Sequence, residues 1–313
     1  MFWRQIASQA TVARAARAAA AVSVGTASLA TAATCATRTN DIELRYFDGQ
    51  GAVETSRLLM ALSGCSYTDT RWKMDMSRPY GQRCPGFIAA KEAGELKANL
   101  DRAPVLLVDG VAIGQSKSIE RFLAQYTGLY GSNEVQGALI DAFTEHIRDL
   151  KLMHAKAPDP AKYSTELYTP LDLAILSMAV LSALTTLVDP SLFTRPCARS
   201  TLNRFTTEVL PAFLQKMERT AGEDALGCIV GTSLSLADVA LYELLCDYFP
   251  AREAYLRGRA PAAAQPGGTE GSPAQGHEAM LKDCPKLAAA VEAVGSHPRI
   301  AAHVASRQYT APW

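Results

Sequence analysis

Residues 104–113 read Pro-Val-Leu-Leu-Val-Asp-Gly-Val-Ala-Ile. Two short apolar runs on either side of an Asp-Gly pair are the strongest short-range signal for a β-hairpin, because both residues accept the backbone angles of a tight turn. The sequence therefore predicts two short antiparallel strands here. A proline opens the first of them, where it has no N–H to donate to a neighbouring strand.

The segments around this hairpin alternate between strand and helix patterns. Residues 42–47 place apolar side chains with a period of two, which is typical of a strand. Residues 52–63 predict a helix, residues 66–72 can form a second strand, and residues 116–126 predict a helix after the hairpin. This order of β-α-β, hairpin and helix resembles the layout of a thioredoxin-like domain, which we predict over residues 41–128.

Beyond residue 132 the apolar side chains follow a period of 3.6 and no further strand pattern occurs. Residues 132–313 are therefore predicted to form an all-helical domain, in which Ser235 and Asp238 match a helix capping box. Within it, residues 257–276 consist mostly of Ala, Pro, Gly, Ser and Gln. This composition predicts a disordered insertion. The fold class is α+β, with an N-terminal thioredoxin-like domain followed by an all-α helical bundle. The predicted helices lie near residues 134–155, 164–188, 199–220, 235–248 and 281–305, the last broken before Pro298.

The first forty residues differ from the rest of the chain. They contain four Arg among many Ala, Ser and Thr, and the first acidic residue is Asp41. A basic, acid-free N-terminus is typical of an organellar transit peptide, and we expect import into an organelle, the mitochondrion ahead of the plastid. A secretory signal and an untargeted tail are the alternatives, the latter leaving the protein in the cytoplasm.

Composition excludes several classes of partner. Thirty-one basic residues balance thirty-one acidic ones, which argues against nucleic acid as the main partner. The most apolar later stretch, residues 173–188, is too short and too rich in hydroxyl groups to cross a membrane, so we expect no membrane partner. The seven cysteines and five histidines show no metal-ligand spacing, so we predict no metal site.

Three positions in the first domain could serve chemistry. Tyr46 ends the first strand, at the edge of the sheet where α/β proteins usually bind ligands, and its phenol can donate a hydrogen bond to a sulfur anion. Gln115 and Ser116 begin a helix whose free amides could hold a carboxylate. A cis bond between Ala103 and Pro104 would free the Ala103 backbone to pair with an extended peptide. Half-buried packing, an ordinary N-cap and a trans proline are the alternatives.

Several short segments follow one another in a recognisable order. They are Tyr-Phe-Asp-Gly-Gln-Gly-Ala-Val-Glu at 46–54, Arg-Leu-Leu at 57–59, Trp-Lys at 72–73, Ala-Pro-Val-Leu at 103–106 and Gln-Ser-Lys-Ser-Ile-Glu-Arg-Phe-Leu-Ala at 115–124. Together they resemble a cytosolic-type glutathione S-transferase, most closely its tyrosine-type, sigma-like classes. Residues 231–245 resemble the helical domain of the same family. The resemblance covers residues 41–250 and resumes at 281–307.

The resemblance implies a role for individual residues. Tyr46 would be the catalytic residue that stabilises the glutathione thiolate, and the backbone of Ala103 would pair with the cysteinyl unit. An acid from a partner subunit would meet the γ-glutamyl amine, with Asp149 or Glu145 as candidates. The remaining implied contacts are Trp72 and Lys73 at the glycyl carboxylate, Gln115 and Ser116 at the γ-glutamyl carboxylate, and Phe47 and Pro104 beside them.

The resemblance also implies an activity. It is the conjugation of glutathione, as co-substrate and without a separate cofactor, to small hydrophobic electrophiles in detoxification by a homodimer. A glutathione-dependent isomerase similar to prostaglandin D synthase, a peroxidase and a non-catalytic ligand-binding module are the alternatives. Ala52 stands where the family commonly has Arg, which could raise the pKa of the bound thiol and reduce activity.

Overall fold

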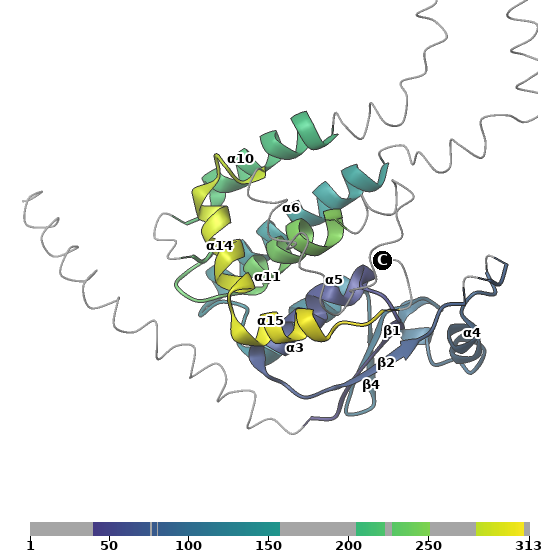
Figure 1. The fold of residues 1–313 in the computed structure, drawn as a ribbon. Helices are drawn as coiled ribbons and strands as arrows, with labels where there is room; N and C mark the ends of the chain where they lie inside the picture. The colour runs from purple at the N-terminus through teal and green to yellow at the C-terminus, as the bar shows by residue number, and fades with distance from the viewer. Residues whose placement is uncertain are drawn as a thin grey trace, which may run out of the picture.

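The computed structural model describes residues 40–75, 77–79, 81–156, 205–222, 227–250 and 280–309 (Figure 1). Three predictions lie outside these residues, namely the transit peptide, the helix near 164–188 and the disordered insertion at 257–276.

The first half of the molecule, residues 41–128, contains a four-stranded mixed sheet in the order β2-β1-β3-β4. The described residues from 132 on form the helical half. β1 (Ile42–Phe47) runs parallel to β2 (Thr68–Trp72) and antiparallel to β3 (Val105–Val108). β3 pairs with β4 (Val111–Gly114) in the hairpin that the Asp-Gly pair predicted. All four predicted strands are confirmed, although β2 begins two residues later than expected.

Two of the predicted helices cover one face of this sheet. A short 3₁₀ helix, η1 (Gly51–Val53), leads into α3 (Glu54–Ser63), which ends at Gly64 with a positive φ of 72°. α5 (Ser116–Thr127) follows the hairpin and packs against α3. Figure 1 shows both helices on the side of the sheet that faces the helical half of the molecule.

One helix of this half was not predicted. α4 (Pro85–Glu92) packs against β2, and the 3₁₀ helix η2 (Lys97–Asn99) follows it. α4 is only eight residues long, and it begins with Pro85 and Gly86, so it offers too few turns for a helical period to stand out. Its Phe87 packs with Phe47 and Trp72 in a small hydrophobic cluster beside the sheet.

The second half is helical, as predicted. α6 (Glu134–Lys156) is confirmed, and the helix expected near 199–220 is present from Phe205. The helix expected at 235–248 is present as α11 (Leu236–Tyr242) and a π-helical continuation, η5 (Glu243–Tyr248). The break expected before Pro298 is confirmed too. The other helices are the π-helix η4 (Phe205–Val209), α10 (Leu210–Thr220), α14 (Pro285–Gly295) and α15 (Pro298–Ser306).

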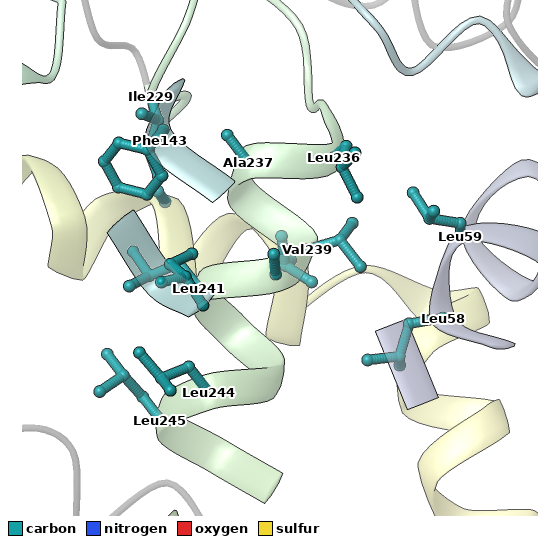
Figure 2. Close-up of a cluster of buried hydrophobic side chains, with 14 of the residues drawn as sticks. Leu58, Leu59, Phe143, Ile229, Leu236, Ala237, Val239, Leu241, Leu244 and Leu245 are labelled. Carbon is teal, nitrogen blue, oxygen red and sulfur yellow. The ribbon is translucent and has the colours of Figure 1, made fainter. Parts of the chain in front are cut away.

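A single hydrophobic core joins the two halves. α11 packs against α3 on one side and against α6 and α14 on the other. Figure 2 shows Leu58 and Leu59 of α3 facing Leu236 and Val239 of α11, and all four side chains are buried. Because α3 follows the loop after β1, this shared core fixes that loop relative to the helical half.

The capping box at the start of α11 is confirmed. The Asp238 carboxylate is buried and accepts hydrogen bonds from the Ser235 N–H at 2.8 Å and the Ile229 N–H at 2.7 Å. It therefore fixes both the first turn of α11 and the segment that precedes it.

Candidate active site

A cavity of about 320 Å³ lies where the loop after β1, the start of α5 and the helical half meet. Its volume is at the lower end of the range for small-molecule sites. The residues that line it are Tyr46, Gln50, Gly51, Ala52, Thr55, Ser116, Lys117, Glu120, Lys151, Glu243 and Tyr248.

Tyr46 contributes a phenol to this cavity. Its hydroxyl oxygen accepts a hydrogen bond from the Ala52 N–H at 3.1 Å. Burial raises the pKa of Tyr46 above its ordinary value, against the Ala52 hydrogen bond and the charge of Arg57, which lower it. The phenol is therefore neutral near pH 7. A hydroxyl that accepts a backbone hydrogen bond is polarised toward donating its own proton, and here it can donate into the cavity.

Gly51 gives the tyrosine hydroxyl its space. It has a φ of +44°, and a Cβ atom built on it would lie 2.5 Å from the Tyr46 hydroxyl oxygen and 2.9 Å from Cε1. A side chain at this position would therefore overlap the ring, and only glycine accepts this backbone conformation without strain.

A fully buried arginine holds the loop between Tyr46 and α3. Arg57 Nη1 donates to the Gly49 carbonyl at 2.6 Å, and Arg57 Nε donates to Asp69 on β2 at 3.1 Å. The guanidinium thus ties the loop to the sheet. The sequence motif included this arginine, but helical periodicity alone gave no sign that its charge is buried.

The N-terminus of α5 forms another part of the cavity. Ser116 lines it, while Gln115 immediately before is exposed and has a φ of +68°. Lys117 Nζ lies beside the same helix end and forms an ion pair with Glu120 at 2.8 Å. Backbone amides at a helix N-terminus, together with a nearby ammonium group, favour an anionic ligand.

The helical half supplies the remaining cavity residues. Lys151 lies on α6, while Glu243 and Tyr248 lie on η5. Residue-by-residue sequence analysis missed these three, because a polar residue on a helix is usually a solvated one and no local pattern marks it. They belong to one site only because the fold places them beside the loop that follows Tyr46.

Seven of the nine predicted glutathione contacts are not among the residues that line the cavity, namely Phe47, Trp72, Lys73, Ala103, Pro104, Gln115 and Asp149. Phe47 and Trp72 pack against Phe87 instead, with ring centroids 5.0 and 5.6 Å from it, and Trp72 is buried. Lys73 follows β2 and is exposed, and Asp149 is exposed on α6. The structure therefore brings Tyr46 and Ser116 to one cavity but leaves these seven outside its lining, and their binding roles stay predictions.

The proline of the hairpin has the predicted geometry. The peptide bond between Ala103 and Pro104 is cis. Ala103 is half-buried, and the Pro104 carbonyl accepts a hydrogen bond from Asn99 Nδ2 at 2.8 Å.

Of the two acids considered for a partner subunit, Glu145 forms ion pairs with Arg121 and Arg148 in its own chain.

The part of the chain that the structure describes has neither a metal-binding cluster nor a membrane-spanning helix. Among those residues, no three His, Cys, Asp or Glu side chains are grouped so that they could hold a metal ion. None of the described helices combines the length and the apolar character that a membrane crossing needs.

Comparisons with known proteins find relatives in sequence and in fold. No family model matches the chain. Over 204 residues it is 30% identical to rat glutathione S-transferase alpha-5 and 29% identical to mouse glutathione S-transferase A3, covering 64% of this chain and 72% of each relative. It is 33% identical to chicken hematopoietic prostaglandin D synthase over 117 residues, 36% of this chain and 49% of that protein.

Solved structures give the same fold. The glutathione S-transferase Na-GST-3 of the hookworm Necator americanus, described as monomeric, matches with a TM-score of 0.53 at 22% identity, over 86% of this chain and 98% of its own. A Pi-class glutathione S-transferase of Onchocerca volvulus matches with a TM-score of 0.53 at 21% identity, over 85% and 93%. The predicted α+β fold is confirmed.

A thioredoxin-like sheet joined to a helical bundle, with a cavity between a strand-end tyrosine and a helix N-terminus, defines the class of protein. Together with the relatives, it places the chain in the glutathione S-transferase family, of the cytosolic type, as an enzyme. The relatives named above carry alpha and Pi class names, so the sigma-like class stays a prediction.

Proposed function

We propose that the cavity binds glutathione with its sulfur at Tyr46 and transfers it to a small electrophilic, hydrophobic compound. The observation that carries this proposal is the Tyr46 hydroxyl, which accepts the Ala52 amide and can donate its proton into the cavity. A free thiol with a pKa near 8.5 is only a few per cent ionised at pH 7, and a hydrogen bond donated to the thiolate lowers that pKa. Glutathione is the co-substrate, and no separate cofactor takes part.

The helix N-terminus supports the orientation of glutathione. Ser116 and the first amides of α5 would hold the γ-glutamyl carboxylate, with Lys117 adding positive charge. As in the family that the chain resembles, the Ala103 backbone would pair with the cysteinyl unit. The tripeptide would then run from α5 past β3 toward Tyr46.

The remaining part of the cavity would take the second substrate. It reaches α6 and η5, where Lys151, Glu243 and Tyr248 form its wall. An electrophile held there would be close to the sulfur at Tyr46, so nucleophile activation and proximity would together supply the catalysis. Removal of reactive hydrophobic compounds, that is detoxification, is the corresponding biological role.

A glutathione-dependent isomerase is the second candidate. The 33% identity with chicken hematopoietic prostaglandin D synthase supports it, although that similarity spans 49% of the synthase. The same thiolate would form a bond to one endoperoxide oxygen as the O–O bond breaks, and the released alkoxide would take a proton. Loss of the proton on the carbon next to the S–O bond would then form a carbonyl and release the thiolate. Product analysis with a prostaglandin endoperoxide separates the two, because a transferase releases a stable glutathione conjugate and an isomerase returns free glutathione.

A homodimer is proposed from exposed apolar side chains. Leu100 and Val111 are exposed in the first half of the molecule, and Val135 and Leu139 lie four residues apart on α6 with more than half of each surface exposed. Val135 and Leu139 are neighbours one turn apart on α6, and an exposed apolar pair of this kind can contribute to a protein interface. Light scattering would give twice the 33.5 kDa of one chain, less any removed leader, whereas the mass of a single chain would contradict the dimer.

Import into an organelle, the mitochondrion ahead of the plastid, is proposed from the acid-free sequence before Asp41. N-terminal sequencing of the protein recovered from fractionated cells tests this. A mature protein that begins near residue 41 in an organellar fraction supports import, and an intact N-terminus in the cytoplasmic fraction contradicts it.

The central proposal is tested by titrating the protein with glutathione at pH 6.5 while following the ultraviolet absorbance of thiolate. We expect a saturable thiolate signal, and none with S-methylglutathione, which binds without a free thiol. Isothermal titration calorimetry measures binding in parallel. Heat of glutathione binding without a thiolate signal or a conjugate would leave only the non-catalytic ligand-binding module. Absence of binding heat would overturn the proposal.

Replacing Gly51 with alanine tests the position of the tyrosine. We expect Gly51→Ala to lower kcat/KM for conjugation about 10-fold or more, because the new methyl group displaces the hydroxyl that meets the sulfur. The matched control is Gly110→Ala, whose φ is +81° and whose added Cβ would meet nothing within 4 Å. Both variants should lose about 1 kcal/mol of stability from left-handed strain, but Gly110→Ala should keep its activity. Equal activities would contradict the proposed role.

A further inference from the structure

The π-helical turn η5 brings two polar side chains to the same side of the cavity. Glu243 and Tyr248 are its first and last residues, and both line the cavity. Residues five apart on an α-helix of 3.6 residues per turn point about 140° away from each other. The wider turn of a π-helix, closed by i→i+5 hydrogen bonds, reduces this divergence and turns both side chains toward the same side. Sequence periodicity predicted an ordinary helix here, so this alignment is a finding of the structure.

These two side chains hold the ammonium group of Lys151, on the opposing helix α6. Lys151 Nζ forms an ion pair with Glu243, whose side chain is only 3% exposed, and it lies 4.8 Å from the centre of the Tyr248 ring. The Tyr248 hydroxyl donates to the Lys151 backbone carbonyl at 3.4 Å. The Lys151 side chain keeps 20% of its surface exposed and lines the cavity. The ammonium is therefore fixed in place but accessible to a ligand.

The ion pair between Lys151 and Glu243 favours a neutral substrate over an anionic one. A substrate that carried a permanent anion would have to compete with Glu243 for the same ammonium. A neutral substrate that develops negative charge only during the reaction would not compete in the ground state, yet it would be stabilised in the transition state. An ammonium has three N–H donors, so Lys151 can keep its bond to Glu243 and donate a second one to an oxygen in the cavity.

We infer that Lys151 is a catalytic residue that donates a hydrogen bond to the carbonyl oxygen of electrophiles whose carbonyl is conjugated to a carbon–carbon double bond. The inference rests on the proposed function. The glutathione thiolate forms a bond to the β-carbon, the π electrons of the double bond shift, and the carbonyl oxygen becomes an enolate oxygen beside Lys151. A proton from Lys151 or solvent then reaches the α-carbon, and the lysine is reprotonated from water, so that no atom leaves and no redox partner is needed.

The test compares two neutral electrophiles of similar size, trans-4-phenyl-3-buten-2-one and benzyl chloride. The first develops its charge on a carbonyl oxygen, while the second has no oxygen and releases chloride. Because removing the ammonium alone would leave Glu243 buried without a counter-charge, the main variant is the double substitution Lys151→Met with Glu243→Gln. Lys151→Arg keeps a cation, and Lys216→Met on the exposed face of α10 is the matched control.

We expect the double variant to lower kcat and kcat/KM for the enone about 10-fold or more, since the lost interaction exists mainly in the transition state. Turnover of benzyl chloride should fall much less than turnover of the enone, because the variant changes the wall of its site but removes no interaction with a developing oxyanion, and the Kd for glutathione should stay close to the wild-type value. Lys151→Arg should recover part of the enone activity, and Lys216→Met should behave as wild type. Equal losses on both substrates, or no loss on the enone, would overturn the inference. A wild-type protein that converts neither substrate would instead count against the proposed function itself.

Discussion

Replacing Tyr46 with phenylalanine is expected to lower kcat/KM for glutathione conjugation about 100-fold at pH 6.5. A hydrogen bond to a charged group contributes about 1.5–3 kcal/mol, and each 1.4 kcal/mol corresponds to a tenfold change. Tyr46 is half-buried, and its hydroxyl accepts the Ala52 amide and can donate its own proton into the cavity, so this donated hydrogen bond is lost in the variant. Steady-state rates with glutathione and benzyl chloride measure the effect.

The pH profile separates a chemical role of Tyr46 from a structural one. Without the hydroxyl, the rate should rise with pH up to the ordinary thiol pKa of about 8.5, and the difference from wild type should shrink above that pH. Tyr130→Phe removes a phenol that is not among the residues lining the cavity and should leave the profile unchanged. Unchanged turnover of Tyr46→Phe at pH 6.5 would remove this residue from the mechanism.

Replacing Arg307 with methionine is expected to lower the free energy of unfolding by about 3–5 kcal/mol, because it leaves buried carboxylates without their counter-charge. Arg307 donates to both oxygens of Asp247, at 2.7 and 3.0 Å, and its Nε lies 2.9 Å from a carboxylate oxygen of Glu54. All three side chains are buried. Denaturation by urea, with the slope checked against wild type, measures the loss.

The matched control is an arginine in an exposed ion pair. Arg78 Nε lies 3.1 Å from Asp75, and both side chains are about half exposed. Arg78→Met should therefore change the free energy of unfolding by less than about 1 kcal/mol. A comparable loss in the two variants would show that the buried network contributes no more than a surface pair.

The same network makes a prediction about acid. Burial by itself would raise the pKa of Glu54, but His303, Arg307, Arg57 and Tyr309 outweigh it and lower that pKa to about 2. A carboxyl group whose pKa is lower in the folded state contributes stability above its unfolded value, here 4.5. That contribution should disappear as the pH falls from about 4.5 through 2, and Arg307→Met should lose less stability than wild type over this window.

Local patterns in the sequence were enough to predict the sheet and most helix ends. The Asp-Gly pair specifies a turn that few other residues allow, and Gly64 and Gly128 mark helix ends because both have positive φ angles there. The π-helical form of η5 was not predictable in this way, because its residues follow an ordinary helical pattern.

The candidate site was predictable only where it lies on one short segment. Tyr46 and Ser116 follow directly from a strand end and a helix start. Lys151 and Glu243, by contrast, are 92 residues apart, and each resembles a solvated helix residue until the fold brings them together. Trp72 packs with Phe87 and is not among the residues that line the cavity, so its expected role at the glycyl carboxylate stays a prediction.

The contact between α3 and the segment after α15 has a consequence for synthesis on the ribosome. Glu54 and the Tyr309 hydroxyl, 2.7 Å apart, are separated by 255 residues. The Tyr309 ring also lies 5.4 Å from the guanidinium carbon of Arg57, the arginine that holds the loop after Tyr46. The thioredoxin-like half emerges first, yet its buried acid lacks most of its partners until that late segment has been translated. We therefore expect nascent chains stopped before residue 307 to have an incompletely folded thioredoxin-like half that chaperones can bind. The loop between Tyr46 and α3 should become rigid last.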